Sequence, residues 1–172
     1  MTAQLDDSFL KHINENLGIA KKVLRVYFQD TDEREDALQE MMYQLWRSYP
    51  HFDGRSKFST WMYKVCLNTA LTIRRNSKRR QSESLSPMHE QIAVESPDRN
   101  NEAIAQLLEA IAELSSLNKA IVLLYLEDMS YDEIASVVGI SRSNVSVRLV
   151  RIKRELETII NQKTKSKSHV NT

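Results

Sequence analysis

The scarcity of chain-turning residues constrains this chain more than any other feature. Only 3 glycines and 3 prolines occur among its 172 residues, whereas folds built from hairpins need such residues at most of their turns. A hydrophobic content of 41% can supply a buried core for one domain or two small ones. The sequence therefore argues against an all-β fold and predicts an all-α protein.

Apolar periodicity divides the predicted helices into two groups. Apolar residues recur every three or four positions in residues 9–28, 37–46 and 61–73, and again in residues 104–114, whereas residues 118–127 are almost wholly apolar and are expected to form a central core helix. Between the groups, residues 76–101 are rich in serine and poor in large apolar side chains, which is typical of a flexible linker. We predict a helical domain over residues 1–80, a linker over 81–101, a second helical domain over 102–160 and a disordered tail over 161–172.

Charge is strongly segregated along the chain, although the net charge is only +1. Residues 30–40 carry six acids and one base, residues 55–80 carry eight bases and no acid, and residues 142–154 carry five bases and no acid. Two separate basic segments favour two contacts with a polyanion such as nucleic acid, because lysine and arginine opposite phosphates release counterions. Solvated faces of ordinary helices are the alternative explanation.

A helix-turn-helix is predicted within residues 130–156. Ser130 and Glu133 have the spacing of a capping box, Gly139 falls where a left-handed residue ends a helix, and Ser141 can cap the next helix. A plain helical hairpin is the alternative. The second helix of such a motif normally enters the major groove, where residues near its start read base edges and later bases hold phosphates. The candidate contacts are Ser141, Arg142, Ser143, Asn144, Ser146, Val147, Arg148, Arg151 and Lys153.

The first basic segment also contains aromatic residues. Phe52, Phe58 and Trp61 lie in or beside the loop HFDGRSK at residues 51–57. This mixture suits single-stranded nucleic acid, because cations bind phosphates and flat apolar side chains stack on unpaired bases. Packing in a helical core is the competing interpretation for Phe58 and Trp61.

Several classes of chemistry lack their sequence signals. Cys66 is the single cysteine, the 4 histidines are scattered, and the sequence has no glycine-rich phosphate loop. No stretch approaches the roughly 20 apolar residues of a membrane span, and the first residues do not form a signal sequence. We expect a cytoplasmic, non-enzymatic protein without metal, cofactor or membrane insertion, in which Cys66 is a buried apolar residue.

Two long segments of the chain resemble sigma factors of bacterial RNA polymerase, of the small two-domain extracytoplasmic-function (ECF) type. They are EREDALQEMMYQLWRSYPHFDGRSKFSTWMYKVCLNTAL at Glu33–Leu71 and LEDMSYDEIASVVGISRSNVSVRLVRIKREL at Leu126–Leu156. The segments occur in the expected order and are separated by a linker of the expected length. The resemblance implies binding to core RNA polymerase and promoter DNA, with an anti-sigma factor as a further partner.

The resemblance also implies roles for individual residues. The surface that docks on polymerase would comprise Glu33, Asp36, Gln39, Glu40 and Met41. The pocket for a base flipped out of the downstream (minus ten) element would comprise His51, Phe52, Asp53, Gly54, Arg55, Ser56, Lys57, Phe58, Trp61 and Asn68. The nearby phosphates would be held by Arg74, Arg75, Lys78, Arg79 and Arg80. The helix-turn-helix would read the upstream (minus thirty-five) element as duplex.

The alternative function is a stand-alone helix-turn-helix transcriptional regulator. It would explain Asp36, Gln39 and Glu40 only by coincidence. A nuclease is less favoured, because both basic segments lack carboxylates. Ser146 and Val147 depart from the residues common in the family, so the preferred upstream sequence is expected to be unusual.

Overall fold

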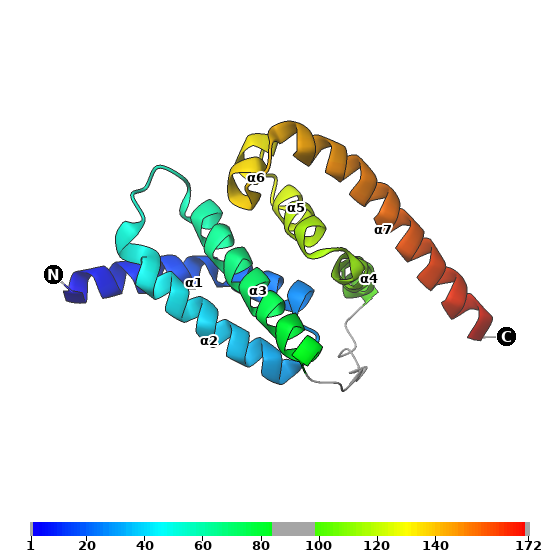
Figure 1. The fold of residues 1–172 in the computed structure, drawn as a ribbon, viewed down its shortest axis with the longest axis horizontal. Helices are drawn as coiled ribbons and strands as arrows, with labels where there is room; N and C mark the ends of the chain where they lie inside the picture. Colours follow the sequence, from blue (N-terminus) through cyan, green and yellow to red (C-terminus); the bar gives the residue numbers. More distant parts are fainter. Residues whose placement is uncertain (1, 84–98, 171–172) are drawn as a thin grey trace. The chain divides into compact units, whose positions relative to one another are not determined.

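The described part of the chain is helical, which confirms the all-α prediction. The computed structural model describes the backbone of residues 2–83 and 99–170, and the side chains of residues 7–80 and 103–165. Seven α-helices and one short 3-10 helix, without a strand, make up these ranges (Figure 1). The chain divides into two compact units, Met1–Ile92 and Ala93–Thr172. None of the described helices is both long and apolar enough to cross a membrane.

The first unit contains three α-helices. They are α1 (Thr2–Tyr27), α2 (Thr31–Ser48) and α3 (Phe58–Glu83), and the 3-10 helix η1 (Tyr49–His51) follows α2. Helix α2 starts after Asp30, whose side chain accepts a hydrogen bond from the Glu33 N–H at 3.0 Å. Figure 1 shows α2 and α3 running antiparallel, so that the beginning of α2 lies beside the end of α3.

The core of the first unit is formed by one stripe from each helix. In α2 the stripe is Ala37, Met41 and Leu45, spaced by one helical turn. Helix α3 contributes Cys66, whose burial raises the pKa of its thiol to about 12. This confirms the expectation that Cys66 is a buried apolar residue. The buried residues of α1 and its end are Phe9, Ile13, Ile19, Ala20, Val23, Leu24, Val26, Tyr27 and Phe28.

The second unit packs three helices against one long helix. These are α4 (Arg99–Glu113), α5 (Ser116–Leu126), α6 (Tyr131–Val138) and α7 (Arg142–Val170). Helix α5 is the central element, because every residue from Ala120 to Leu124 is buried. The facing stripe of α7 consists of Val145, Leu149, Ile152 and Leu156.

The turn between α6 and α7 confirms the predicted helix-turn-helix. Ser130 and Glu133 form a reciprocal capping box at the start of α6, and Gly139 ends that helix with a left-handed φ of 76°. The Ser141 hydroxyl then accepts a hydrogen bond from the Asn144 N–H at 3.3 Å, at the start of α7. The capping residues of the motif therefore determine where α6 begins and ends and where α7 begins.

Two of the predicted boundaries are wrong. The tail predicted as disordered is helical as far as Val170. One reason is that Lys163 Nζ lies 2.7 Å from Glu113 Oε1 and 3.7 Å from Glu109 Oε2, so ion pairs hold this part of α7 against α4. Residues 81–83 and 99–101 of the predicted linker belong to α3 and α4, and residues 84–98 lie outside the described residues.

Candidate functional site

The predicted docking surface on α2 separates into an exposed part and a buried residue. Asp36, Gln39 and Glu40 are exposed. Met41 is 0% exposed, so its assignment as a polymerase contact is wrong. The physical reason is its spacing, because Met41 lies one turn after Ala37 and therefore faces the core.

Two large aromatic residues extend the exposed face of α2 and were not among the predicted contacts. Tyr43 is 51% exposed and Trp46 is 56% exposed. They follow Gln39 by four and seven residues, so they share its side of the helix. Large exposed aromatic residues are typical of protein interfaces. The helical spacing from Gln39 is the signal that could have identified them.

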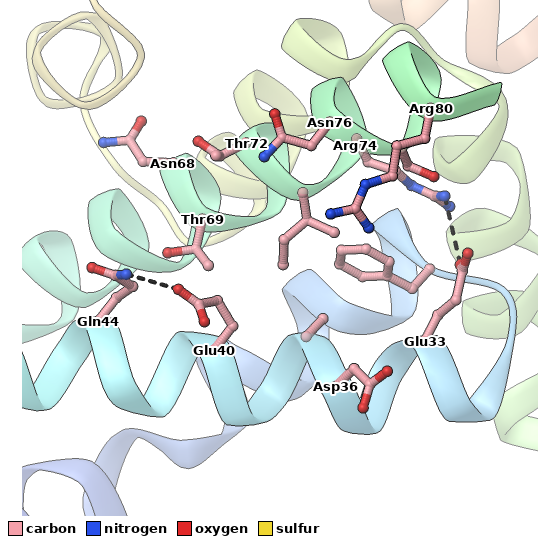
Figure 2. A pocket seen from close by; sticks show the side chains of 14 residues that line it. Glu33, Asp36, Glu40, Gln44, Asn68, Thr69, Thr72, Arg74, Asn76 and Arg80 are labelled. Carbon is pink, nitrogen blue, oxygen red and sulfur yellow. Dashed lines mark hydrogen bonds and ion pairs between the residues drawn. The ribbon is translucent and has the colours of Figure 1, made fainter. Parts of the chain in front are cut away.

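A groove of about 630 Å³ lies between α2 and α3. Figure 2 shows its acidic wall on α2, with Glu33, Asp36 and Glu40, and its polar wall on α3. Glu40 accepts a hydrogen bond from Gln44 Nε2 at 2.7 Å. The residues from α3 are Asn68, Thr69, Thr72, Ile73, Arg74, Asn76, Ser77 and Arg80. The groove therefore borders the predicted polymerase surface on one side and the predicted DNA surface on the other.

Arg74 is bound within the protein, and this differs from its predicted role at a phosphate. Its Nε donates a hydrogen bond to the Tyr27 carbonyl at 2.7 Å, and its Nη1 lies 3.5 Å from Glu33 Oε2. The guanidinium carbon also lies 4.9 Å from the centre of the Phe28 ring. These contacts engage the guanidinium within the protein, so Arg74 is a structural residue of the first unit instead of a phosphate contact.

The other bases of α3 point in two directions. Arg80 lines the groove, and in Figure 2 its side chain extends between the two walls. Arg75 and Arg79 are exposed and lie on the same side of the helix as Asn68, because residues advance by about 100° around a helix, and the exposed Lys78 lies about 80° further round. Lys64, one turn before Asn68, is also exposed and joins this row, although it was not predicted as a contact.

The loop before α3 is open to solvent. His51, Asp53, Gly54, Arg55, Ser56 and Lys57 are all exposed. Asp53 and Arg55 form an ion pair, and the Arg55 backbone N–H donates to Asp53 Oδ1 at 3.1 Å. These hydrogen bonds, and the charge of Arg55, lower the pKa of the Asp53 carboxyl from its usual value. Gly54 turns the loop with a left-handed φ of 71°.

The aromatic residues beside this loop form one half-buried cluster. Phe52 and Trp61 have ring centres 5.2 Å apart, and Phe58 lies 5.2 Å from Trp61 and 5.5 Å from Phe52. His12 of α1 stacks on Phe58 at 4.8 Å. The rings of Phe58 and Trp61 pack within this cluster and remain partly exposed, which is compatible with both interpretations. Asn68 lies ten residues further along α3, roughly 15 Å from Phe58 at the normal helical rise.

Helix α7 exposes most of its predicted contacts. Arg142, Ser143, Asn144, Ser146 and Val147 are exposed, as are Ser141, Arg151 and Lys153. Val150 and Arg154 are exposed on the same outer side, opposite the core stripe, and extend the predicted surface. Val150 was missed because it looks like a core residue, but it follows the exposed Val147 by three positions.

Three of the predicted cationic contacts of α7, namely Arg142, Arg148 and Lys153, have partners within the second unit. Arg142 Nε lies 3.5 Å from Asp132 Oδ2. Lys153 Nζ donates to the Tyr125 hydroxyl at 3.3 Å and lies 4.8 Å from the centre of that ring. Arg148 is the one half-buried member of the predicted set.

Comparison with known families assigns both units. Residues 12–80 match the family described as Sigma-70 region 2, and residues 104–156 match the family described as Sigma-70, region 4. The first match contains the α2 face, the groove and the loop. The second contains the helix-turn-helix.

Individual relatives agree with this assignment. The chain is 27% identical over 161 residues to RNA polymerase sigma-H factor of Pseudomonas aeruginosa, which covers 86% of this chain and 81% of that protein. It is 29% identical over 139 residues to ECF RNA polymerase sigma factor SigM of Bacillus subtilis, covering 78% and 83%.

Solved structures support the fold. The sigma factor RpoE from Bartonella quintana, solved with the anti-sigma factor NepR, superposes with a TM-score of 0.78 at 19% identity, covering 90% of this chain and 97% of that one. CnrH, solved with the cytosolic domain of CnrY, gives a TM-score of 0.65 at 18% identity, covering 93% and 94%. The order of the two matched regions, the relatives and the all-α fold agree, and the chain belongs to the ECF sigma factors of the sigma-70 family.

Proposed function

We propose that the protein is an alternative sigma factor, which binds core RNA polymerase and directs it to a particular class of promoters. The observation that carries this function is the presence of both sigma-70 regions in one chain, in the family's order. A stand-alone helix-turn-helix regulator is not favoured, because it would give no reason for region 2. The function needs no bond chemistry, and we assign no catalytic residue, metal or cofactor.

The outer face of α2 is the proposed polymerase-docking surface. It comprises the predicted Glu33, Asp36, Gln39 and Glu40 together with Tyr43 and Trp46, and it excludes the buried Met41. Exposed acids attract a basic partner and set its register, whereas the desolvation of large aromatic side chains supplies affinity. This combination suits a stable complex with a large partner.

The loop at residues 51–57 and the row on α3 are the proposed contacts with the downstream element. The exposed loop and the partly exposed rings of Phe52, Phe58 and Trp61 can accept an unstacked base. Lys64, Arg75, Lys78 and Arg79 can follow the strand's phosphates, with Arg80 at the groove. Flipping a base costs a few kcal/mol, which selective contacts with the captured base must offset.

Helix α7 is the proposed reader of the upstream element as duplex DNA. Its outermost side chains, which include Ser143, Val147 and Val150, would face the base edges. Arg142, Arg151, Lys153 and Arg154 would hold the phosphates on either side. The proposed division of labour assigns residues 1–80 to polymerase and the downstream element, residues 102–160 to the upstream element and the segment between them to a linker.

The family also suggests regulation and location. Two solved relatives are described as complexes, one with an anti-sigma factor and one with a cytosolic domain. We propose that this protein also binds an anti-sigma factor. Transcription initiation places the protein in the bacterial cytoplasm, beside the chromosome.

The test is reconstitution of transcription. The purified protein is mixed with bacterial core RNA polymerase and a library of duplex DNA fragments, and bound fragments are selected and then transcribed. We expect stoichiometric co-elution with polymerase and enrichment of fragments that share two spaced sequence elements. DNA binding by the protein alone, with no co-elution with polymerase, would instead identify a stand-alone regulator.

A further inference from the structure

Arg148 differs from the other predicted contacts of α7 in its surroundings. It is half-buried, whereas the remaining predicted residues of this helix are exposed. Its Nη1 donates a hydrogen bond to Oδ1 of Asn118, which lies 30 residues earlier on α5, at 3.2 Å. A guanidinium has only donors, so its partner on Asn118 must be the amide oxygen. The hydrogen bond can therefore run only from Arg148 to Asn118, and it links α7 to α5.

Asn118 is itself held in place at the start of a rigid helix. Its backbone N–H donates to Oγ of Ser115, the residue that caps α5, at 3.4 Å. The next turn of α5 is fully buried from Ala120 onwards. The backbone of Asn118 is consequently held at the start of a rigid helix, and the hydrogen bond to its side-chain oxygen restricts the rotamers of Arg148.

The position of Arg148 on α7 decides which part of DNA it can reach. Val145 and Leu149, on either side of it in the sequence, belong to the core stripe, so Arg148 lies on the flank of the helix next to that stripe. Val147 and Val150 lie on the opposite, outermost side. A helix in the major groove turns its outermost side chains to the base edges and its flanks to the phosphates at the groove walls.

We infer that Asn118 is a positioning residue, which holds the Arg148 guanidinium on the flank of α7 for a contact with a backbone phosphate of the upstream element. One Nη1 hydrogen bond goes to Asn118, and the other N–H groups of the fork can face a phosphate. The pair would fix the register of the recognition helix, while neighbouring residues read the sequence. This inference rests on the proposed function and changes the expected role of Arg148 from reading bases to setting register.

A double-mutant cycle in the polymerase-bound protein tests the inference. Wild type, Asn118→Ala, Arg148→Ala and the double variant are assembled with core polymerase and bound to duplex fragments that carry the selected upstream element or its single-base variants. Asn118→Ala keeps the helix cap, because Asn118 takes part in the cap through its backbone N–H. The matched control is Asn161→Ala, which removes an exposed amide of α7 beyond the predicted DNA contacts and leaves the Arg148 pair intact.

We expect each single variant to weaken binding by roughly tenfold, equally for all upstream sequences, because a hydrogen bond to a charged group is lost or misplaced. The double variant should bind no more weakly than Arg148→Ala, since Asn118 acts through Arg148. The salt dependence separates the roles further. Arg148→Ala should lower the slope of log affinity against log salt by about 1, and Asn118→Ala should leave the slope unchanged because the charge remains.

Three results would overturn the inference. Loss of preference at one or two base pairs in either variant would make Arg148 a base reader. Fully additive losses in the double variant would show that Asn118 acts independently of Arg148, and wild-type affinity in Asn118→Ala would show that it does not act at all. If wild-type protein with polymerase selects no upstream sequence, the proposed function fails and this inference fails with it.

Discussion

Arg74 of α3 and Glu33 of α2 meet at one end of the groove, where Arg74 Nη1 lies 3.5 Å from Glu33 Oε2. The same guanidinium donates to the carbonyl of Tyr27 and lies over the ring of Phe28. A single side chain therefore joins the end of α1, the start of α2 and the second half of α3. Arg74 therefore has a structural role, although the sequence alone does not distinguish it from the neighbouring bases of α3.

Replacement of Arg74 by alanine should destabilise the first unit by about 1–3 kcal/mol, because a part-buried carbonyl loses its charged donor. Arg75→Ala is the matched control, and this exposed residue should change the free energy of unfolding by no more than about 0.5 kcal/mol. Urea unfolding followed by tryptophan fluorescence reports on this unit selectively, since both tryptophans, Trp46 and Trp61, belong to it. Equal destabilisation by the two variants would contradict the structural role of Arg74.

Charge reversal on the outer face of α2 should prevent polymerase binding without unfolding the protein. Asp36→Lys combined with Glu40→Lys places two cations where the proposed partner requires acids, and like charges at an interface cost several kcal/mol. Asp7→Lys with Glu15→Lys makes the same change in net charge on exposed positions of α1. Size-exclusion co-elution with core polymerase should be lost in the α2 variant and kept in the α1 variant. If the α2 variant still co-elutes with core polymerase, the outer face of α2 is not the docking surface.

Asn68→Ala should impair the opening of duplex promoters more than binding to promoters that are already melted. Asn68 is exposed beside Lys64 in the row of α3 that is proposed to contact the separating strands. Loss of its amide should raise the cost of melting, whereas a pre-melted template avoids that cost. Permanganate reactivity of unpaired thymines measures opening on both templates, with Asn16→Ala on α1 as an amide control. Equal defects on the two templates would indicate a role outside melting.

Val150→Ser should reduce discrimination at one or two upstream base pairs by about 1 kcal/mol. The exposed Val147 and Val150 form an apolar pair on the outer side of α7, and apolar side chains in the major groove contact the methyl group of thymine. Arg154→Ala should instead weaken binding to all sequences alike. Competition binding by the polymerase-bound protein distinguishes the two patterns. An unaltered sequence preference in Val150→Ser would exclude this residue from base reading.

Cys66 should resist alkylation in the folded protein, even at pH 9. Burial raises the pKa of its thiol to about 12, so the reactive thiolate is scarce until the chain unfolds. An unfolded thiol ionises at about pH 8.5, so between about pH 8.5 and 12 the thiol is ionised in the unfolded state and protonated in the folded state. Stability should therefore decline across that interval in wild type and decline less in Cys66→Ala. Iodoacetamide labelling with and without urea tests the first expectation, and rapid labelling without urea would contradict it.

The sequence predicted the fold where structure depends on neighbouring residues in the chain. The capping box at Ser130 and the left-handed turn at Gly139 are local features, and both were predicted correctly. The role of Arg74 depends on Tyr27, 47 residues away, and no local pattern reveals that contact. The helical tail was missed for the same reason, because Lys163 finds its acidic partners on α4.

The candidate site was predictable to a similar extent. The predicted acids of α2 and most predicted contacts of α7 are exposed, but Met41, which the resemblance assigned to the docking surface, is buried. Adjacent residues on a helix point about 100° apart, so a motif read as a linear string mixes surface and core. Applying the helical period would have replaced Met41 with Trp46.

The two caps of the helix-turn-helix have an evolutionary consequence. Ser130, Glu133 and Gly139 define where α6 starts and stops, and none of them lies on the outer side of α7. Apart from Ser141, which caps α7 and is also a predicted DNA contact, the residues that set the helix boundaries therefore differ from those proposed to read DNA. Mutations at Ser143, Val147 or Val150 can accumulate with little effect on the scaffold, so a duplicated copy of this gene could drift toward new promoters without first losing its fold.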